Sequence, residues 1–354
     1  GLHAEEGLMP LTLYVDGNRW RHHLTGVVER EPGLVPVVKG NGYGFGLGRL
    51  ARRATWLERD TIAVGTYAEV AAVEKRFPGS VLVLSPWRPT VATPLLDRMV
   101  HTVGRLEDLR DLQARGASDG VRPRIVLELV TSMLRHGFTA AGLREAGRAL
   151  TGCRLEGVAL HLPLAADQVP EVERLLTDIV AAGLPTRTVH VSHLSDVELA
   201  AVRSTWPDYT FRPRVGTGLW LGDRGALDVR ATVIDAHPLA RGQRFGYRQR
   251  SAPRAGTLLV VSGGTAHGIG LEAPTGDRSF RSRAGSLARG GLDAAGLVRS
   301  PYTVDGKQRL FAEPPHMQAS MLFLPSGATV PEVGAEVPVR VRYTATSFDQ
   351  VKIG

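Results

Sequence analysis

The sequence predicts two domains: an N-terminal (β/α)8, TIM-like barrel over residues 11–225 and a C-terminal β-domain over residues 226–354. Short β-branched runs alternate with helix-like segments through the first part of the chain, which is typical of a parallel barrel. From about Asp228 the strand-like runs continue without a convincing helix. A doubly wound open sheet is the alternative for the first domain, but the Gly-rich fingerprint that usually follows its first strand is absent.

The predicted elements follow one another in a regular order. The strand-like runs of the first domain are Val35–Lys39, Ile62–Thr66, Val81–Ser85, Met99–Val103, Arg124–Val130, Leu155–Pro163, Thr188–Leu194 and Tyr209–Gly216. The helix-like segments between them include Arg49–Glu58, Tyr67–Phe77, Leu106–Arg115, Ala140–Leu150, Pro170–Ala182 and Ser195–Ser204. The second domain has strand-like segments at Val229–Ala236, Thr257–Ser262, Arg309–Ala312, Gln318–Leu324 and Val337–Thr344. A strand at Leu11–Val15 can pair with either domain, and residues 271–306, rich in Gly, Arg and Ser, are expected to form a long loop.

The composition excludes several classes of protein. With 354 residues, 43% hydrophobic and 22% charged, the chain is typical of a globular protein. No run approaches the roughly 18 apolar residues of a membrane span, and the N-terminus has no secretory pattern. The single cysteine, Cys153, excludes an intrachain disulfide and favours the cytoplasm. The net charge is +8, but the arginines are scattered, so anionic small molecules are better partners than nucleic acid. No metal site is predicted.

Residues 35–46, VPVVKGNGYGFG, are the most informative stretch of the chain. An apolar run ends at Lys39, and a Gly-rich turn follows. A lysine at the carboxyl end of a buried strand lies where parallel α/β folds bind ligands, and desolvation there lowers its pKa and makes it a nucleophile for Schiff-base chemistry. Lysine is scarce in this arginine-rich chain, and only lysine can form an imine. The alternative is a surface lysine before a flexible turn.

The segment VVKGNGYGFG resembles the lysine motif of alanine racemases and related fold-type III enzymes, usually written AVVKANAYGHG. The resemblance implies that Lys39 binds pyridoxal 5'-phosphate as a Schiff base. It also implies an isomerase that acts at Cα of an amino acid or an amino-acid-bearing compound. The expected assembly is a homodimer in which the β-domain completes the active site of the partner subunit.

A second segment, RVGTGLWLG at residues 214–222, resembles the family's RxGIxxYG. By this resemblance Arg214 faces the pyridine nitrogen of the cofactor, where an arginine does not protonate the ring and leaves it a weaker electron sink. The backbone N–H groups of Gly216 and Thr217 would bind the phosphate. Tyr43 and Tyr343 are implied as hydroxyl donors to the same phosphate.

Further matches concern the phenolic oxygen of the cofactor and the substrate. TSMLRHG resembles TGMxRxG and implies that Arg135 contacts this oxygen and the substrate. Glu128 stands where alanine racemases usually have a lysine, often carbamylated, and is expected within salt-bridge reach of Arg135. EPPHMQASMLFLP resembles GRxSMDQ and implies that the backbone N–H of Met317 binds the substrate carboxylate.

Two more segments suggest supporting residues. GVALHLP resembles GxxTHF, so His161 would support Arg214; a lone strand histidine is otherwise a structural residue. In HVSHLS, Leu194 occupies the place of the family's phosphate-binding serine. Ser195 is therefore the remaining candidate, or this role is lost.

The chain departs from the family pattern in the β-domain. Alanine racemases have GYADG there, with a tyrosine that acts as acid/base on the face opposite the lysine, but this chain has VVSGGTAHGIG. Depending on the alignment, Ser262 or Thr265 takes the tyrosine place, and His267 takes the aspartate place. A serine or threonine hydroxyl is a poor proton acceptor near neutral pH, whereas His267 has a suitable unperturbed pKa. We therefore expect a protein that is not an efficient alanine racemase.

Two alternatives to an isomerase remain open. One is a fold-type III decarboxylase or lyase, whose chemistry needs a base on one face only. The other is a catalytically lapsed cofactor-binding protein with a regulatory or partner-binding role. The missing tyrosine favours both alternatives over an isomerase. The intact lysine and arginine positions argue against the catalytically lapsed protein. We expect Arg278, Arg281 or Arg283 in the 271–306 segment to select an acidic substrate.

Overall fold

The expected barrel is formed by eight parallel strands in the computed structural model, which describes residues 9–92, 94–271 and 297–354. The strands in spatial order are β2 (Val35–Pro36), β9 (Thr210–Val215), β8 (Thr188–Ser192), β7 (Arg154–His161), β6 (Arg124–Leu129), β5 (Met99–Val103), β4 (Ser80–Pro86) and β3 (Thr61–Val64). A parallel bridge between Val37 and Ala63 joins β2 to β3. The predicted fold class of this part is confirmed.

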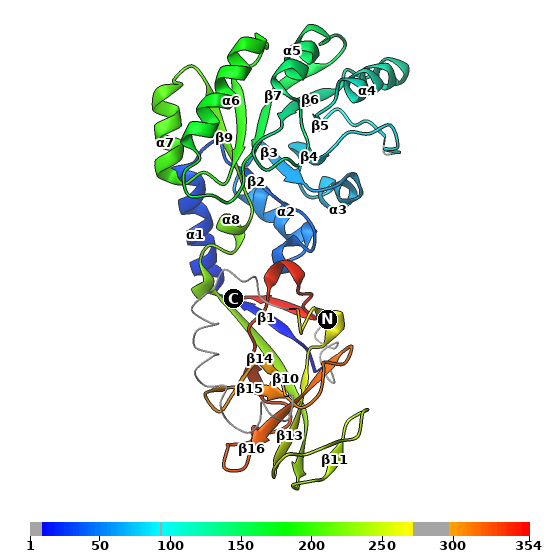
Figure 1. Ribbon diagram of the computed structural model, residues 1–354, viewed down its shortest axis with the longest axis vertical. Coiled ribbons are helices and arrows are strands. Elements are labelled where there is room, and N and C mark those ends of the chain that lie inside the picture. The colour runs from blue at the N-terminus through cyan, green and yellow to red at the C-terminus, as the bar shows by residue number, and fades with distance from the viewer. Residues whose placement is uncertain (1–8, 93, 272–296) are drawn as a thin grey trace. The chain divides into compact units, whose positions relative to one another are not determined.

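Helices follow most of these strands (Figure 1). They are α1 (Gly17–Arg30), α2 (Leu47–Trp56), α3 (Val70–Glu74), α4 (Leu106–Asp119), α5 (Ala140–Arg148), α6 (Val169–Ala182), α7 (Asp196–Thr205) and α8 (Thr217–Trp220). The sequence analysis missed α1 and α8. The buried residues Trp20, Leu24 and Val28 recur every four positions, which is the helical signal that could have revealed α1.

Contacts divide the chain into two units: a barrel unit, His22–Gly222, and a sheet unit, Gly1–Arg21 with Asp223–Gly354. The barrel interior is filled by apolar side chains from strands β2 to β7, with two of them from β2 and the position after it. They are Val35, Val37, Ala63, Leu82, Val100, Val126 and Ala159. The polar side chains of the barrel unit lie beyond this layer, at the carboxyl ends of the strands.

The sheet unit contains a largely antiparallel sheet and a small hairpin. The sheet runs β14 (Arg299–Val304), β15 (Lys307–Phe311), β16 (Ala319–Pro325), β13 (Gly256–Ser262), β10 (Leu227–Leu239), β1 (Thr12–Val15) and β18 (Gln350–Ile353), and β17 (Glu336–Pro338) also pairs with β10. The hairpin joins β11 (Arg244–Phe245) to β12 (Arg250–Ser251).

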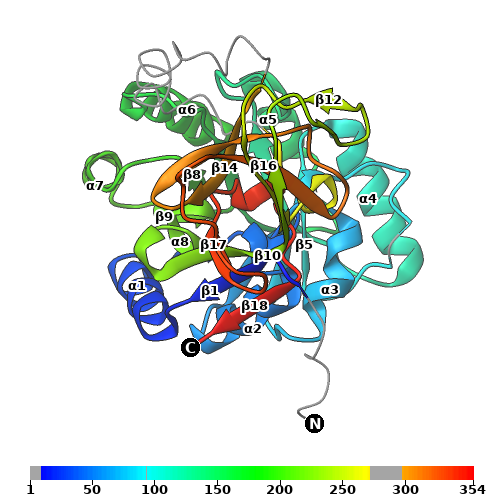
Figure 2. The ribbon, with the colours of Figure 1, turned by 90° about the horizontal axis from the view of Figure 1, so that it is seen from below.

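The structure corrects three expectations for this part of the chain. Strand β1 lies in the sheet unit rather than the barrel, because it pairs with β10 on one side and β18 on the other (Figure 2). Residues 299–304 form strand β14 rather than loop, since they pair with β15. Tyr343–Ala345 is a 3-10 turn and not strand. Arg278, Arg281 and Arg283 lie outside the described residues.

Candidate active site

Lys39 lies three residues beyond the end of strand β2 and opens a tightly folded loop. Five backbone positions of this loop have a positive φ: Gly40 and Gly42 at 61° and 62°, Tyr43 at 55°, and Gly44 and Gly46 at 90°. Tyrosine rarely adopts this conformation, so the surrounding packing must hold it there. The indole Nε1 of Trp220 donates a 2.8 Å hydrogen bond to the Val37 carbonyl and ties α8 to the strand that leads into Lys39.

A carboxylate that the sequence analysis missed fixes the start of this loop. The Glu69 Oε2 accepts the Gly40 N–H at 2.6 Å, and its Oε1 accepts the N–H groups of Gly65 and Thr66 at 2.8 and 2.9 Å. A carboxylate that accepts several backbone N–H groups is held in one position. Glu69 therefore locks the ends of β2 and β3 together beside Lys39.

The electrostatic surroundings of Lys39 favour its neutral amine. Burial lowers the pKa of Lys39, the guanidinium groups of Arg135 and Arg214 lower it further, and Glu69 opposes them. The side chain nevertheless remains accessible to solvent. A reachable amine with a lowered pKa is a suitable nucleophile for a carbonyl group.

Arg214, near the end of β9, is a buried cation with an unused donor. Its residue is 6% exposed, and its buried Nη2 has no hydrogen-bond partner among the described residues. Burial lowers the pKa of this guanidinium, and the carboxylate of Glu128 opposes that shift. A buried donor without an acceptor is costly, which indicates that a ligand acceptor belongs there.

Three of the residues expected to bind a phosphate, Tyr43, Gly216 and Thr217, lie together beyond the end of β9. A Cβ on Gly216 would lie 1.9 Å from the Tyr43 hydroxyl, so only glycine fits beside that group. Gly216 caps the short helix α8, whose first residue is Thr217. Burial raises the pKa of Tyr43 to about 12, so its hydroxyl stays protonated and can donate to an anion.

The predicted contact between Glu128 and Arg135 is confirmed. Arg135 Nη2 lies 3.4 Å from Glu128 Oε1, and the Glu128 side chain is only 2% exposed. His136 Nδ1 lies 2.6 Å from Glu128 Oε2, but neither atom has a hydrogen bond of acceptable geometry. The approach of His136 to Glu128 is therefore electrostatic and is not a hydrogen bond. The loop after β6 thus directs two basic side chains onto one buried carboxylate.

His161 lies at the end of β7, but its visible partner is not Arg214. Its Nδ1 is 3.0 Å from the Ser192 hydroxyl, and its ring lies edge-to-face against His193 at 5.2 Å. Burial, together with the charges of Arg135 and Arg214, lowers the pKa of His161 to about 3. A neutral imidazole at this position avoids adding a further positive charge to the site.

Ser195 is a helix cap in this structure. Its hydroxyl accepts the Glu198 N–H at 3.2 Å, and the Glu198 carboxylate accepts the Ser195 N–H at 3.1 Å. This reciprocal capping box occupies the serine and places a carboxylate beside it, which disfavours a phosphate at the same place. The expectation that Ser195 binds the cofactor phosphate is therefore not supported by its contacts.

The two hydroxyl candidates of the sheet unit differ in their surroundings. Ser262, at the end of β13, is buried; its hydroxyl accepts the Thr232 N–H at 2.8 Å and donates to the Pro10 carbonyl at 3.0 Å. These bonds give Ser262 a structural role in place of the catalytic one considered above. Thr265 is exposed in the following turn, where its N–H donates to the His316 carbonyl at 2.6 Å.

His267 also has a structural environment. Its Nδ1 accepts the Gly264 N–H at 3.2 Å, and its Nε2 lies 3.0 Å from a carboxylate oxygen of Asp349. Asp349 in turn accepts the Leu11 N–H at 2.8 Å. Because both ring nitrogens are engaged, His267 has no lone pair to accept a further proton and instead fixes this turn to the C-terminal segment.

The remaining predicted residues also lie in the sheet unit. The ring of Tyr343 faces the Arg224 guanidinium at 5.1 Å, and burial raises the pKa of its hydroxyl. The side chain of Met317 is 73% exposed, and its carbonyl accepts the Ala266 N–H at 2.8 Å. Their expected roles toward phosphate and substrate remain predictions.

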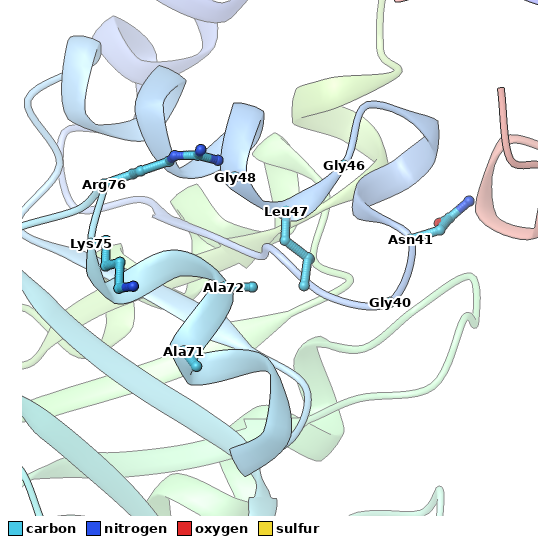
Figure 3. A pocket seen from close by; sticks show the side chains of 9 residues that line it. All are labelled: Gly40, Asn41, Gly46, Leu47, Gly48, Ala71, Ala72, Lys75 and Arg76. Carbon is cyan, nitrogen blue, oxygen red and sulfur yellow. The ribbon is translucent and has the colours of Figure 1, made fainter. Parts of the chain in front are cut away.

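A pocket of about 560 Å³ adjoins the lysine loop (Figure 3). It is lined by Gly40, Asn41, Gly46, Leu47, Gly48, Ala71, Ala72, Lys75 and Arg76. None of Lys39, Arg135 and Arg214 lines it, so it is distinct from the place where those side chains converge. Lys75 and Arg76 make its rim positive.

The fold and the converging side chains define a class: a barrel enzyme with a reactive lysine at the end of a strand and donors suited to a phosphorylated ligand. Residues 15–220 match the family model described as "Alanine racemase, N-terminal domain", and the chain belongs to this family. Among curated relatives, alanine racemase from Symbiobacterium thermophilum is 26% identical over 300 residues, or 72% of this chain and 79% of the relative. Alanine racemase from Nitratidesulfovibrio vulgaris is 27% identical over 259 residues, or 66% and 69% of the two chains.

Solved structures share the fold over nearly the whole chain. Alanine racemase from Bartonella henselae, with covalently bound pyridoxal phosphate, has a TM-score of 0.71 and 16% identity, and the match covers 97% of this chain and 99% of that one. Histidine racemase from Leuconostoc mesenteroides subsp. sake has a TM-score of 0.68 and 17% identity, with 99% of each chain covered. Within residues 9–92, 94–271 and 297–354, no helix has the length and hydropathy of a membrane span.

Proposed function

We propose that the protein is a pyridoxal-phosphate-dependent, racemase-like isomerase that binds its cofactor at Lys39. It acts at Cα of an amino acid or an amino-acid-bearing compound, and alanine is a poor substrate. The family membership and the site in the barrel unit support the proposal. A cytoplasmic location and a homodimeric assembly are part of it.

The single observation that carries the proposal is the unsatisfied Nη2 of buried Arg214. An unprotonated pyridine nitrogen is an acceptor only, so it complements this donor. Gly216, Thr217 and the Tyr43 hydroxyl provide backbone and side-chain donors for the phosphate. The described residues of the barrel unit therefore fit the cofactor.

When bound, pyridoxal phosphate supplies an electron sink for the pair released at Cα. The chain supplies the rest of the chemistry. The Lys39 amine would hold the cofactor, and the same amine would carry a proton to or from one face of the substrate carbon. The Arg214 guanidinium would donate to the pyridine nitrogen and so leave it unprotonated, and Glu128 offsets the positive charge of Arg135.

A one-face decarboxylase or lyase is the second candidate. The observation that favours it is the engagement of Ser262 and His267 in structural hydrogen bonds, which leaves neither free for proton transfer on the second face. Such an enzyme would exchange the Cα proton with retention or remove a carboxyl or leaving group.

The experiment is exchange of Cα hydrogen in deuterated water with both enantiomers of each amino acid. The proposal expects at least one amino acid to gain deuterium and change chirality, and Lys39→Ala to lose both activities. Exchange with retention for every amino acid would favour the one-face enzyme. No exchange by wild-type protein saturated with pyridoxal phosphate would contradict the isomerase. Release of carbon dioxide or of a leaving group without exchange or inversion would then favour the second candidate, and absence of every one of these reactions would contradict both.

A further inference from the structure

The loop between β6 and α5, residues 130–139, carries Arg135 and is tied to helix α6 by a carboxylate. Glu171, in the first turn of α6, accepts the Ser132 N–H on Oε1 at 2.5 Å and the Ser132 hydroxyl on Oε2 at 2.6 Å. Arg174 approaches the same carboxylate only to 3.7 Å and is 62% exposed, so Ser132 is the closer partner. Two hydrogen bonds to one charged acceptor fix the orientation of a group as well as its position.

Hydrogen bonds rather than apolar burial hold this part of the loop. Met133 and Leu134 are 42% and 78% exposed, and Leu134 has a left-handed backbone at φ 54°. A non-glycine residue seldom adopts this conformation unless its surroundings impose it. The Leu134 N–H donates to the Thr131 carbonyl at 2.9 Å, and the Thr131 hydroxyl donates to the His161 carbonyl at 2.7 Å. These bonds, with those of Ser132, determine the path of the chain through the turn.

Helix α6 is a firm anchor for Glu171. Its apolar residues are buried in the core of the barrel unit. Gln168, which precedes the helix, is 1% exposed; its N–H donates to Glu198 Oε2 at 2.7 Å, and its side-chain amide donates to the Pro163 carbonyl. The Glu171 side chain itself is 16% exposed. The carboxylate that binds the loop is therefore held in place by the barrel.

Arg135 depends on the position of this loop because its own ion pair is long. Its Nη2 lies 3.4 Å from Glu128 Oε1, whereas a charge-assisted bond between nitrogen and oxygen is usually about 2.7–2.9 Å. The guanidinium is nevertheless close enough to Lys39 to lower the pKa of that amine. Because the energy between charges falls with distance, a displaced loop would weaken both interactions.

We propose that Glu171 is a positioning residue for Arg135: by binding Ser132, its carboxylate sets the loop so that the guanidinium stays near Lys39 and Glu128. The family's TGMxRxG has a glycine where this chain has Ser132, so the hydroxyl bond is a feature of this chain. The inference rests on the proposed function, in which Lys39 binds the cofactor. The alternative is that the carboxylate joins α6 to the loop and contributes to folding stability alone.

The test measures how fast pyridoxal phosphate attaches to protein freed of cofactor, as a function of pH, by absorbance in stopped flow. Glu171→Ala removes both hydrogen bonds, and Ser132→Ala removes only the hydroxyl bond. Glu171→Gln keeps an acceptor for the N–H. Glu173→Ala is the matched control, because Glu173 lies on the same helix and its carboxylate has no hydrogen bond or ion pair within the described residues. Urea unfolding of each protein measures the contribution to stability separately.

We expect Glu171→Ala to shift the profile to higher pH, with attachment at least about threefold slower below the plateau. The reason is that Arg135 moves away and no longer lowers the pKa of Lys39. Loss of the Glu171 charge acting directly on the lysine would shift the profile the other way, to lower pH. The other titratable groups that interact electrostatically with Lys39 are unchanged in every variant; they are Arg214, Glu69 and His161.

Ser132→Ala should shift the profile in the same direction by a smaller amount, whereas Glu171→Gln and Glu173→Ala should stay close to wild type. Combined with Arg135→Ala, Glu171→Ala should cause no further shift, because the group that it positions is already absent. If Glu171→Ala does not fold, Ser132→Ala decides alone.

Wild-type profiles for Glu171→Ala and Ser132→Ala, whatever their stability, would overturn the inference and leave the carboxylate a purely structural role. A further shift when Glu171→Ala is added to Arg135→Ala would also overturn it. Wild-type protein that attaches no pyridoxal phosphate at Lys39 would instead refute the proposed function, and this inference with it.

Discussion

At the residue scale, the site is a cluster of positive charges held around one buried carboxylate. Lys39, Arg135 and Arg214 are close enough for the two guanidinium groups to lower the lysine pKa. Glu128 offsets this charge from inside the barrel, where its side chain is 2% exposed. The lowered pKa of Lys39 and the unused Arg214 donor are two features of the same arrangement.

The first prediction concerns the pH dependence of Lys39 in protein freed of cofactor. Because its pKa lies below the ordinary lysine value, the amine is unprotonated at lower pH than other lysines. The rate at which added pyridoxal phosphate attaches should therefore rise with pH and level off earlier than its reaction with Nα-acetyl-lysine. Absorbance in stopped flow measures both rates. Coincident pH profiles would show that the site leaves this amine unchanged.

The second prediction concerns Glu128. Glu128→Gln leaves Arg135 without its buried partner and should lower the free energy of unfolding by about 1–3 kcal/mol, measured in urea. Glu156→Gln is the control, since the Glu156 carboxylate, which pairs with Arg124 and Arg154, is 24% exposed and should contribute less than about 1 kcal/mol. Added bicarbonate should not change activity, because a glutamate needs no carbamylation. Bicarbonate activation would contradict this view of the position.

At the scale of elements, hydrogen bonds distinguish Gly216 from Ser195, although the sequence motifs assigned both residues to the phosphate. Gly216 begins α8 beside the Tyr43 hydroxyl, whereas Ser195 begins α7 within a capping box. Both are N-terminal residues of a helix after a barrel strand, so sequence position does not distinguish them. The difference is that Ser195 already has its own acidic partner, Glu198.

The third prediction therefore concerns Gly216. Gly216→Ala places a methyl group 1.9 Å from the Tyr43 hydroxyl and must displace the ring or the backbone. We expect at least about tenfold weaker retention of pyridoxal phosphate, a loss of about 1.4 kcal/mol. Equilibrium dialysis of the released cofactor gives the value. Unchanged affinity would remove this glycine from the phosphate site.

The fourth prediction concerns the cap of α7. Ser195→Ala should cost about 1 kcal/mol of folding stability, because the Glu198 N–H loses its acceptor. The affinity for pyridoxal phosphate should stay as in wild type. A loss of cofactor affinity larger than that of Gly216→Ala would restore Ser195 to the phosphate site.

At the scale of the whole molecule, the sequence was sufficient for the barrel and for most residues at its strand ends. Alternating strands and helices predicted the architecture, and the position of Lys39 after an apolar run predicted a reactive amine. The contact between Glu128 and Arg135 followed from the family resemblance, in which Glu128 stands in the place of a lysine that is often carbamylated. The alternation of elements and the apolar run before Lys39 are local signals, which need no knowledge of tertiary contacts.

What the sequence could not predict depends on contacts between distant segments. Glu69 accepts the Gly40 N–H across 29 positions, and the Asp349 that binds His267 is 82 positions away. No spacing rule anticipates such pairs. The hydrogen bond between Glu313 and His316 is local, but Glu313 also accepts the N–H of Tyr247, which is 66 positions earlier. Strand β1 was ambiguous because its pairing partners, β10 and β18, come from the far end of the chain.

The most direct measurement of the central claim is the mass of what is attached to Lys39. Purified protein would be incubated with pyridoxal phosphate, reduced with borohydride, digested and analysed by mass spectrometry, with Lys39→Ala as the control. The account predicts a pyridoxyl-phosphate increment on the peptide that contains Lys39, together with a visible absorbance band that the variant lacks. An unmodified Lys39 peptide, or an equal increment on Lys75, Lys307 and Lys352, would contradict it.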